Sequence, residues 1–410
     1  MIVQQRLPRD GTILFISHEA SRTGAPIVLL NVMRWLRSHI SNRFRIILRT
    51  GGPLEQQFGK LGEVHVVAHA GLNESYLRDV CLIYSNTVTN GPFLRTLPYG
   101  EIPILTHVHE LGHSIDKLGS YNLREVRTHS SHFIACSHIV AKVLTQIYGI
   151  DGDTVSVIPE SIFPSEVRSD SQIEDLGMLR KILGIGEDEF IVVGCGTVSY
   201  RKGVDLFVQL AAYCSQHVSR ISFIWIGSLS DDFSRGFFQH DACKLGVSHK
   251  IKFVGQLENP HSVMAAADLF CLPSREDPFP LVMLEAGALG KPVLAFEQSG
   301  GAEEYCGQGA GFLVPYLNVR AMGDLILDHM DDKAALLKVG EQARKLVQEK
   351  YNIDSTGPMF AGLIRHFSRN AGAGAAGIAQ LFLPTSRGHI EESSVCQQVI
   401  PHRWNRMKFT

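Results

Sequence analysis

Two acidic residues at the ends of a turn between a strand and a helix are the feature of this chain most suited to chemistry. Asp277 lies in a proline-rich turn, and Glu285 follows with seven residues between them, inside an apolar run that begins at Leu281. Pro280 has a fixed φ that favours the first turn of a helix. The backbone N–H groups of that turn, from Phe279 onward, lack helical partners and attract negative charge. The pattern predicts a ligand in which hydroxyl groups flank an anionic group.

The surrounding sequence supports this interpretation, because acids in an exposed turn are common by themselves. The apolar run 268–272 predicts a buried strand directly before the turn. In sheets of parallel strands, ligands collect beyond the carboxyl ends of the strands. Asp277 is therefore expected at a ligand-binding edge of a sheet.

Length and composition indicate a soluble globular protein of two domains. A chain of 410 residues exceeds what one hydrophobic core usually holds. Hydrophobic residues make up 45% and charged residues 20%, the net charge is −2, and no apolar run is long enough to span a bilayer. Nucleic acid is therefore not an expected partner. Residues 1–6 lack the order of a secretory signal, and the eight cysteines lack metal-binding spacing, so we expect a cytoplasmic protein with reduced thiols.

Short β-branched runs alternate with helical runs through the first part of the chain. Strands are predicted at 12–17, 45–50, 64–68, 80–85, 104–109, 132–137 and 155–159. Helices are predicted between them, most clearly at 25–38, where apolar residues repeat on one face. Strands that are continuously apolar are typical of a parallel sheet covered on both faces. Residues 1–164 are therefore predicted to form one doubly wound α/β domain.

A second alternation follows a charged, serine-containing stretch at 165–189. Strands are predicted at 190–195, 221–226, 251–254, 268–272, 292–296 and 311–314, and helices at 204–217, 234–245, 281–289 and 319–330. We predict a second doubly wound domain at 165–350, facing the first across a cleft. A closing helix is predicted at 351–369 and a flexible tail at 370–410.

The chain resembles the retaining glycosyltransferases of group 1, also called family 4, which have the GT-B fold of two Rossmann-like domains. The resemblance extends over residues 10–368 and is strongest over 190–311. The family carries an acid, seven residues and a glutamate in its second domain, a spacing met by Asp277 and Glu285, while Glu276 stands one position earlier. The resemblance implies that one of Asp277 and Glu276 binds hydroxyls of the donor sugar. It also implies that Glu285 binds the ribose, and a carboxylate suits such a diol because it accepts two hydrogen bonds.

Other motifs resemble the parts of the family that hold the nucleotide. Arg201 and Lys202 precede a predicted helix, and the resemblance implies that they neutralise the departing diphosphate. The helix start at Phe279, Pro280 and Leu281 would steady the same group. Gly24 follows the first strand in a loop that resembles the one over the donor phosphates, and the base is expected beside the loop at Gly255.

The run from His109 to His113 matches the zinc-protease pattern H-E-x-x-H. That pattern requires a helix, whereas 101–108 predicts a strand emerging after a proline. Read as a strand end, the run places His109 at the cleft, and the resemblance implies that His109 contacts the donor sugar. His107, two residues earlier, is expected to point to the opposite face of the sheet.

The function expected from these features is transfer of a sugar from a nucleotide sugar to a hydroxyl acceptor, with retention of the anomeric configuration and without a metal or other cofactor. The acceptor would be a glycan, a lipid-linked saccharide or a small molecule. Arginines at 34, 37, 43, 45 and 49 would suit peripheral contact with the cytoplasmic face of a membrane, although such charges often only solvate a helix. The alternatives are a nucleotide-sugar epimerase, a zinc metalloprotease, and an inactive module that binds a nucleotide sugar.

Overall fold

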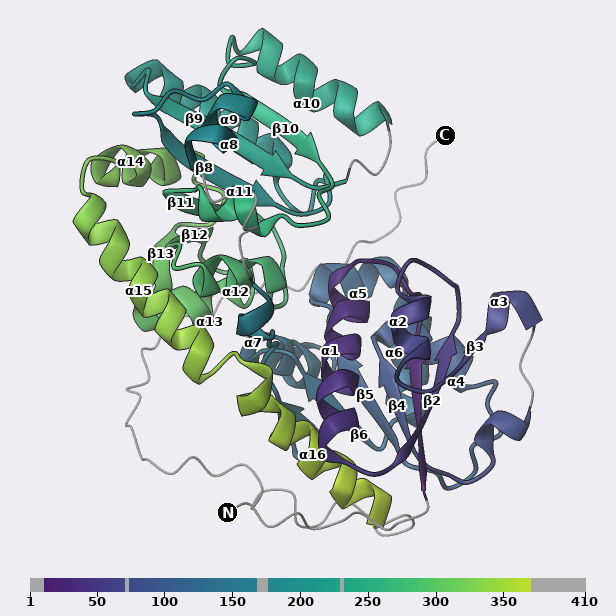
Figure 1. Cartoon of the computed structure of the whole chain (residues 1–410). Coiled ribbons are helices and arrows are strands. Elements are labelled where there is room, and N and C mark those ends of the chain that lie inside the picture. Colours follow the sequence, from purple (N-terminus) through teal and green to yellow (C-terminus); the bar gives the residue numbers. More distant parts are fainter. Residues whose placement is uncertain (1–10, 71–73, 168–175, 229–231, 370–410) are drawn as a thin grey trace, which may run out of the picture.

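Two parallel β-sheets, each covered by helices, form the two halves of the molecule (Figure 1). The structure is a computed structural model, and it describes residues 11–70, 74–167, 176–228 and 232–369. The tail predicted at 370–410 lies outside the described residues. The predicted fold class, two doubly wound parallel-sheet domains, is confirmed.

The first sheet has seven strands in the order β3-β2-β1-β4-β5-β6-β7. The strands are β1 (Thr12–Ser17), β2 (Arg43–Leu48), β3 (Glu63–Val66), β4 (Val80–Asn86), β5 (Ile104–Val108), β6 (His132–Ala135) and β7 (Val155–Val157). The helices are α1 (Gly24–His39), α2 (Glu55–Gly59), α3 (Val67–Ala70), α4 (Gly91–Leu94), α5 (Gly112–Leu118), α6 (Ser120–His129) and α7 (His138–Lys142). Every residue of β1 is buried, as expected for a continuously apolar strand at the centre of a covered parallel sheet.

The second sheet has six strands in the order β10-β9-β8-β11-β12-β13. The strands are β8 (Phe190–Cys195), β9 (Ile221–Ile226), β10 (Ile251–Gly255), β11 (Leu269–Leu272), β12 (Val293–Phe296) and β13 (Gly311–Val314). The helices are α8 (Leu176–Leu183), α9 (Val204–His217), α10 (Asp232–Lys244), α11 (His261–Ala265), α12 (Leu281–Ala288), α13 (Ala302–Tyr305), α14 (Val319–His329) and α15 (Lys333–Glu349). The strand order reverses between β1 and β4 and between β8 and β11, and such switch points are where ligands bind.

The last described helix, α16 (Ile353–Arg369), returns from the second domain and packs on the first, beside α1 (Figure 1). Trp35 of α1 donates from Nε1 to Asp354 Oδ1 at 2.9 Å. A Cβ at Gly357 would come within 2.2 Å of the Trp35 ring, so the two helices touch at a glycine. The first domain is therefore completed by the C-terminal end of the described chain.

The two places where the chain crosses between domains lie side by side. Ile162 donates its backbone N–H to the carbonyl of Tyr351 at 3.1 Å, and Ile353 donates to the carbonyl of Ile162 at 2.9 Å. The buried hydroxyls of Ser161 and Thr356 lie 2.6 Å apart beside them. The crossings are thus joined by both backbone and side-chain hydrogen bonds.

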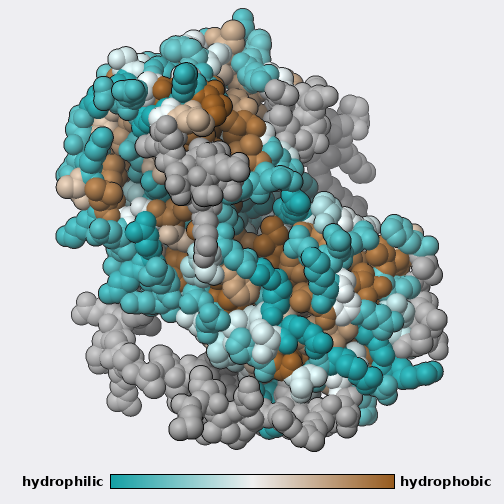
Figure 2. All heavy atoms as spheres, viewed as in Figure 1, coloured by the Kyte–Doolittle hydropathy of each residue, from teal (hydrophilic) through white to brown (hydrophobic). Residues whose placement is uncertain are grey.

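The arginines expected to form a basic face on the first domain have partners within the protein. Arg34 pairs with Glu166, Arg45 pairs with Glu63, and Arg49 donates to the carbonyl of Thr89. Arg37 donates to the Asn42 carbonyl, and Arg43 lies 4.0 Å from Asp79. Membrane contact through this cluster stays a prediction. On the face drawn in Figure 2, hydrophilic residues cover most of the outer surface. Among the described residues, every helix is too short or too polar to cross a membrane.

Candidate functional site

A cavity of about 460 Å³ lies between the two domains, at the carboxyl ends of the strands of both sheets. The lining residues lie at or just beyond these strand ends. The first domain contributes His18 after β1, Thr87 after β4, His109 after β5 and Glu160 after β7. The second domain contributes Cys195 at the end of β8, Gly227 after β9, Gln256 after β10 and Asp277 after β11. The site therefore requires both halves of the chain.

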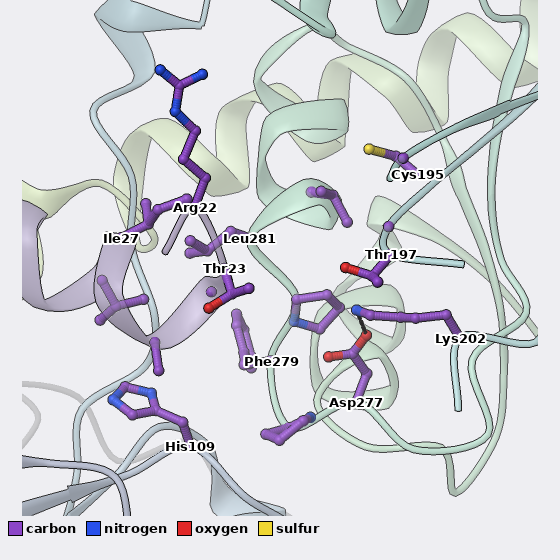
Figure 3. Close-up of a pocket in the computed structure, with 18 of the residues that line it drawn as sticks. Arg22, Thr23, Ile27, His109, Cys195, Thr197, Lys202, Asp277, Phe279 and Leu281 are labelled. Carbon is purple, nitrogen blue, oxygen red and sulfur yellow. Dashed lines mark hydrogen bonds and ion pairs between the residues drawn. The ribbon is translucent and has the colours of Figure 1, made fainter. Parts of the chain in front are cut away.

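Lys202 and Asp277 form an ion pair on the wall supplied by the second domain (Figure 3). Asp277 also lies 3.7 Å from Nη1 of Arg201 and accepts a hydrogen bond of 3.3 Å from the Ser274 hydroxyl. Burial alone would raise the pKa of Asp277, but the charges of Lys202 and Arg201 outweigh burial and lower the pKa below its usual value. The site thus holds a buried carboxylate beside two cations, all three lining the cavity.

The backbone of Asp277 is fixed by the loop that follows β12. Its N–H donates to the Ser299 carbonyl at 2.7 Å, and Asp277 forms a parallel bridge with Gly300. Gly300 has a φ of +134°, and a Cβ there would lie 1.8 Å from the Asp277 carbonyl oxygen. The close approach that places Asp277 therefore requires glycine at 300.

Glu276 faces the first domain instead of the cavity. Its carboxylate accepts from the backbone N–H of His113 at 3.0 Å and from the Ser114 hydroxyl at 2.8 Å. Both donors lie in the first turn of α5, where a negative charge from the other domain stabilises unpaired N–H groups. Of the two candidates for the first acid, Asp277 lines the cavity and Glu276 joins the domains. Arg201 supports the turn by donating to the Glu276 carbonyl at 2.7 Å.

The helix start predicted after the turn is α12, which begins at Leu281. Phe279, Pro280 and Leu281 all line the cavity, and the first turn of α12 contains no acid. Glu285 lies one turn further along, lines the cavity, and has its Oε2 atom 3.8 Å from Nε2 of His261. The unpaired N–H groups and the Glu285 carboxylate thus face the same space.

The two glycine loops reach the cavity differently. Gly24 is the first residue of α1 and lines the cavity. Neighbouring Arg22 also lines it, although its guanidinium points away from the pair of Lys202 and Asp277 (Figure 3). Gly255 ends β10 and is not among the lining residues, which at this loop are the following Gln256 and Leu257.

His109 lies on the opposite wall, beyond β5 (Figure 3). Its Nδ1 atom lies 2.7 Å from Glu160 Oε1 and its Nε2 atom lies 2.8 Å from Asn86 Oδ1. The expectation that His107 points to the other face of the sheet is wrong, because the two rings lie 4.0 Å apart. Side chains alternate along a strand, so residues two apart share a face.

The zinc-protease pattern does not lie on one helix. β5 ends at Val108 and α5 begins at Gly112, so the run from His109 to His113 spans a connection. A different group, His107, His109 and Glu160, brings nitrogen and carboxylate atoms within 4.8 Å of one another. Within this group, Nδ1 of His109 and Oε1 of Glu160 lie 2.7 Å apart and share a hydrogen bond.

The sequence did not identify several residues of the cavity. Glu160, Thr87 and Gly227 line it and were not predicted. Each lies just beyond a parallel strand, at β7, β4 and β9 respectively. The rule that sites form at the carboxyl ends of strands would have found them if it had been applied to every predicted strand.

Comparisons with known proteins agree with this geometry. Residues 178–346 match the model of the family described as glycosyl transferases group 1. The chain is 33% identical over 149 residues to the alpha-galactosylglucosyldiacylglycerol synthase of Streptococcus pneumoniae, a match that covers 36% of this chain and 38% of that protein. It is 25% identical over 266 residues to an uncharacterised glycosyltransferase of Methanocaldococcus jannaschii, covering 63% of this chain and 67% of that one. The chain thus spans well under half the length of the first relative.

A solved structure has the same arrangement of two domains. The crystal structure of Anabaena HepE in complex with UDP-glucose has a TM-score of 0.76 at 22% sequence identity, and the superposition covers 87% of this chain and 99% of that one. The structural likeness concerns the fold, and the match to the family model at 178–346 lies in the second domain. The match to the group 1 glycosyltransferases thus covers residues 178–346, and the chain has the GT-B fold.

Proposed function

We propose that this protein transfers a sugar from a nucleotide sugar to a hydroxyl group of an acceptor, with retention of the anomeric configuration. The observation that carries the proposal is the cavity between the domains, where Lys202, Asp277 and Glu285 face one space. Cations, unpaired N–H groups and carboxylates together suit a diphosphate with a sugar on either side. The match of residues 178–346 to the group 1 glycosyltransferase family supports the reaction type.

Each group has a role that follows from its chemistry. Lys202, Arg201 and the start of α12 stabilise the diphosphate, which gains negative charge as it leaves. Glu285 accepts hydrogen bonds from the ribose, and Asp277 accepts hydrogen bonds from the sugar. His109 bounds the sugar on the opposite wall. Because protein cations neutralise the diphosphate, the proposed reaction requires no metal.

The bond changes are balanced without a further reactant. The bond between the anomeric carbon and the diphosphate oxygen breaks, and the acceptor oxygen bonds to the same face of that carbon. The hydroxyl proton of the acceptor passes to the released diphosphate. Since Lys202 is paired with Asp277 in the structure, the incoming diphosphate shares the Lys202 ammonium with that carboxylate.

The test is incubation with UDP-, GDP- and ADP-sugars, following free nucleotide with and without glycan, lipid-linked and small-molecule acceptors. UDP-glucose is the first donor to try, because the similar structure of HepE contains it. The expected product keeps the anomeric configuration of the donor, which the anomeric proton coupling in NMR reports. The proposal fails if calorimetry finds no binding and no donor releases its nucleotide. Conversion of the donor without an acceptor would instead indicate an epimerase.

A further inference from the structure

His109 has a hydrogen-bond acceptor at each of its ring nitrogens. The Glu160 carboxyl group lies at Nδ1 and the Asn86 amide oxygen lies at Nε2, at 2.7 and 2.8 Å. The orientation of the amide follows from its other end, because Asn86 Nδ2 donates to the Ala25 carbonyl at 2.9 Å. An amide oxygen only accepts, so Nε2 must be the donor. A ring that donates from both nitrogens carries two protons and a positive charge.

The titratable groups around His109 agree with this charge. Burial, with a smaller effect of His109, lowers the pKa of His107 far below its usual value, so that neighbour in β5 is neutral. Burial is also the largest cause of two further shifts. It lowers the pKa of His18, which follows β1, and it raises the pKa of Glu110, which is next to His109 in the sequence. Glu160, beyond β7, is 4% exposed and has a second carboxylate oxygen without a hydrogen-bond partner. A cation stabilises a carboxylate buried in this way, and His109 is a group in contact with it.

We propose that Glu160 and Asn86 are positioning residues that hold His109 as a doubly protonated ring and tie it to the first turn of α1. The inference rests on the proposed function, because it concerns how the donor site is organised. The hydrogen bonds run outward from the His109 ring, which donates to Glu160 on one side and to the Asn86 amide oxygen on the other, and the Asn86 amide donates in turn to the Ala25 carbonyl. Ala25 and Gly24 line the cavity, so this series of hydrogen bonds links the loop at Gly24 to His109 on the opposite wall.

Loss of one proton from the His109 ring would break one of its two buried hydrogen bonds, either the one to Glu160 or the one to Asn86. Either Glu160 or the Asn86 oxygen would then face a nitrogen that cannot donate, and an unmatched buried polar group is costly. The ring, the amide and the loop at Ala25 would have to move together. Donor binding and turnover should therefore depend on the charge of His109, although both ring nitrogens are bonded to protein groups.

The direct test is NMR of the ring nitrogens in the protein without donor, with histidine labelled with 15N and with EDTA present. The His109 signals are assigned by their loss in a His109→Asn variant. Both nitrogens are expected at the shifts of protonated imidazole nitrogens near neutral pH. One unprotonated nitrogen would overturn the inference. Because this experiment involves no turnover, its result is independent of whether the proposed function is right.

The kinetic test uses Glu160→Gln, which keeps the shape of the side chain and removes its charge. The variant should lose one ring proton at neutral pH, and kcat/KM should fall about ten- to hundredfold, the effect of losing a charge-assisted hydrogen bond. Glu160→Asp should recover part of the activity and the second proton. Glu166→Gln, which alters a surface ion pair six positions on, is the control and should behave as the wild type. Wild-type kinetics and two ring protons in Glu160→Gln would refute the role of Glu160.

A second variant tests the link between the His109 ring and the loop at Gly24 separately from the charge of the ring. Asn86→Asp keeps an acceptor for Nε2 but removes the donor to the Ala25 carbonyl. Both ring protons should remain, while KM for the donor rises more than kcat falls. An unchanged KM would refute the link to the glycine loop. If Glu160→Gln does not fold, the ring spectrum of the wild type and this variant still decide the inference.

Discussion

At the scale of single residues, Lys202 and Asp277 form an ion pair on the wall of the cavity. Lys202→Met would leave Asp277 buried with Arg201 at 3.7 Å as its remaining cation. Breaking a buried pair on one side typically costs about 3–5 kcal/mol. We expect a lower free energy of unfolding by urea denaturation, and Lys202→Met combined with Asp277→Asn should recover most of the loss. Equal destabilisation by the single and the double variant would contradict this.

The same pair gives the stability of the protein a defined dependence on pH. Because the folded protein lowers the pKa of Asp277, the stabilisation is present above the usual carboxyl pKa of about 3.9 and is lost as the pH falls through the lowered value. The wild type should therefore lose more stability than Asp277→Asn between pH 6 and pH 3. Thermal unfolding of both proteins across this range measures the difference. Parallel curves for the two proteins would show that Asp277 does not contribute.

A substitution of Glu285 tests the proposal that this residue binds the ribose of the nucleotide. Glu285→Ala should weaken donor binding about ten- to hundredfold, because charge-assisted hydrogen bonds are lost without a change in fold. Calorimetry with the donor and with the free nucleoside diphosphate measures the effect, which should appear for both ligands. Glu341→Ala, on the exposed face of α15, is the control. A loss of affinity for the donor alone would place Glu285 at the sugar instead.

At the scale of elements, the contact between α16 and α1 depends on the absence of a side chain. Gly357→Ala would place a Cβ 2.2 Å from the ring of Trp35, which is buried and held by Asp354. Overpacking of this kind typically costs about 1–3 kcal/mol. We expect a lower melting temperature, whereas Gly362→Ala, with open space around its Cβ, should be neutral or stabilising. Equal melting temperatures for both variants would show that the helices can separate freely.

The elements were easier to predict from the sequence than the contacts between them. The strands at 12–17, 190–195 and 221–226 lie where the sequence predicted them, because continuous apolar runs are specific to buried parallel strands. Asp277 and Glu285, which spacing singled out within one short stretch, both line the cavity. The pairing of Lys202 with Asp277 joins residues 75 positions apart. The sequence does not encode that distance locally, and the same holds for Glu160 beside His109, 51 positions apart.

At the scale of the whole molecule, two carboxylates of the second domain hold helices of the first. Glu276 accepts from the start of α5, and Glu304 accepts from the Ile139 N–H at the start of α7 at 2.9 Å. Replacing both with glutamine should weaken these contacts, open the two domains and raise KM for the donor about tenfold. Small-angle scattering without donor should show a larger radius of gyration. The control is Glu341→Gln with Glu349→Gln, and identical scattering from both double variants would contradict the prediction.

The bridge between the two interdomain crossings constrains how such opening can occur. Since Ile162 is bonded to both Tyr351 and Ile353, the two connections cannot swing independently. We expect the two connections to act as one hinge. The two domains would then rotate about this hinge without sliding past each other. Cleavage of the backbone in one connection should leave this hinge in place, because the other connection and the hydrogen bonds between the two would still hold it.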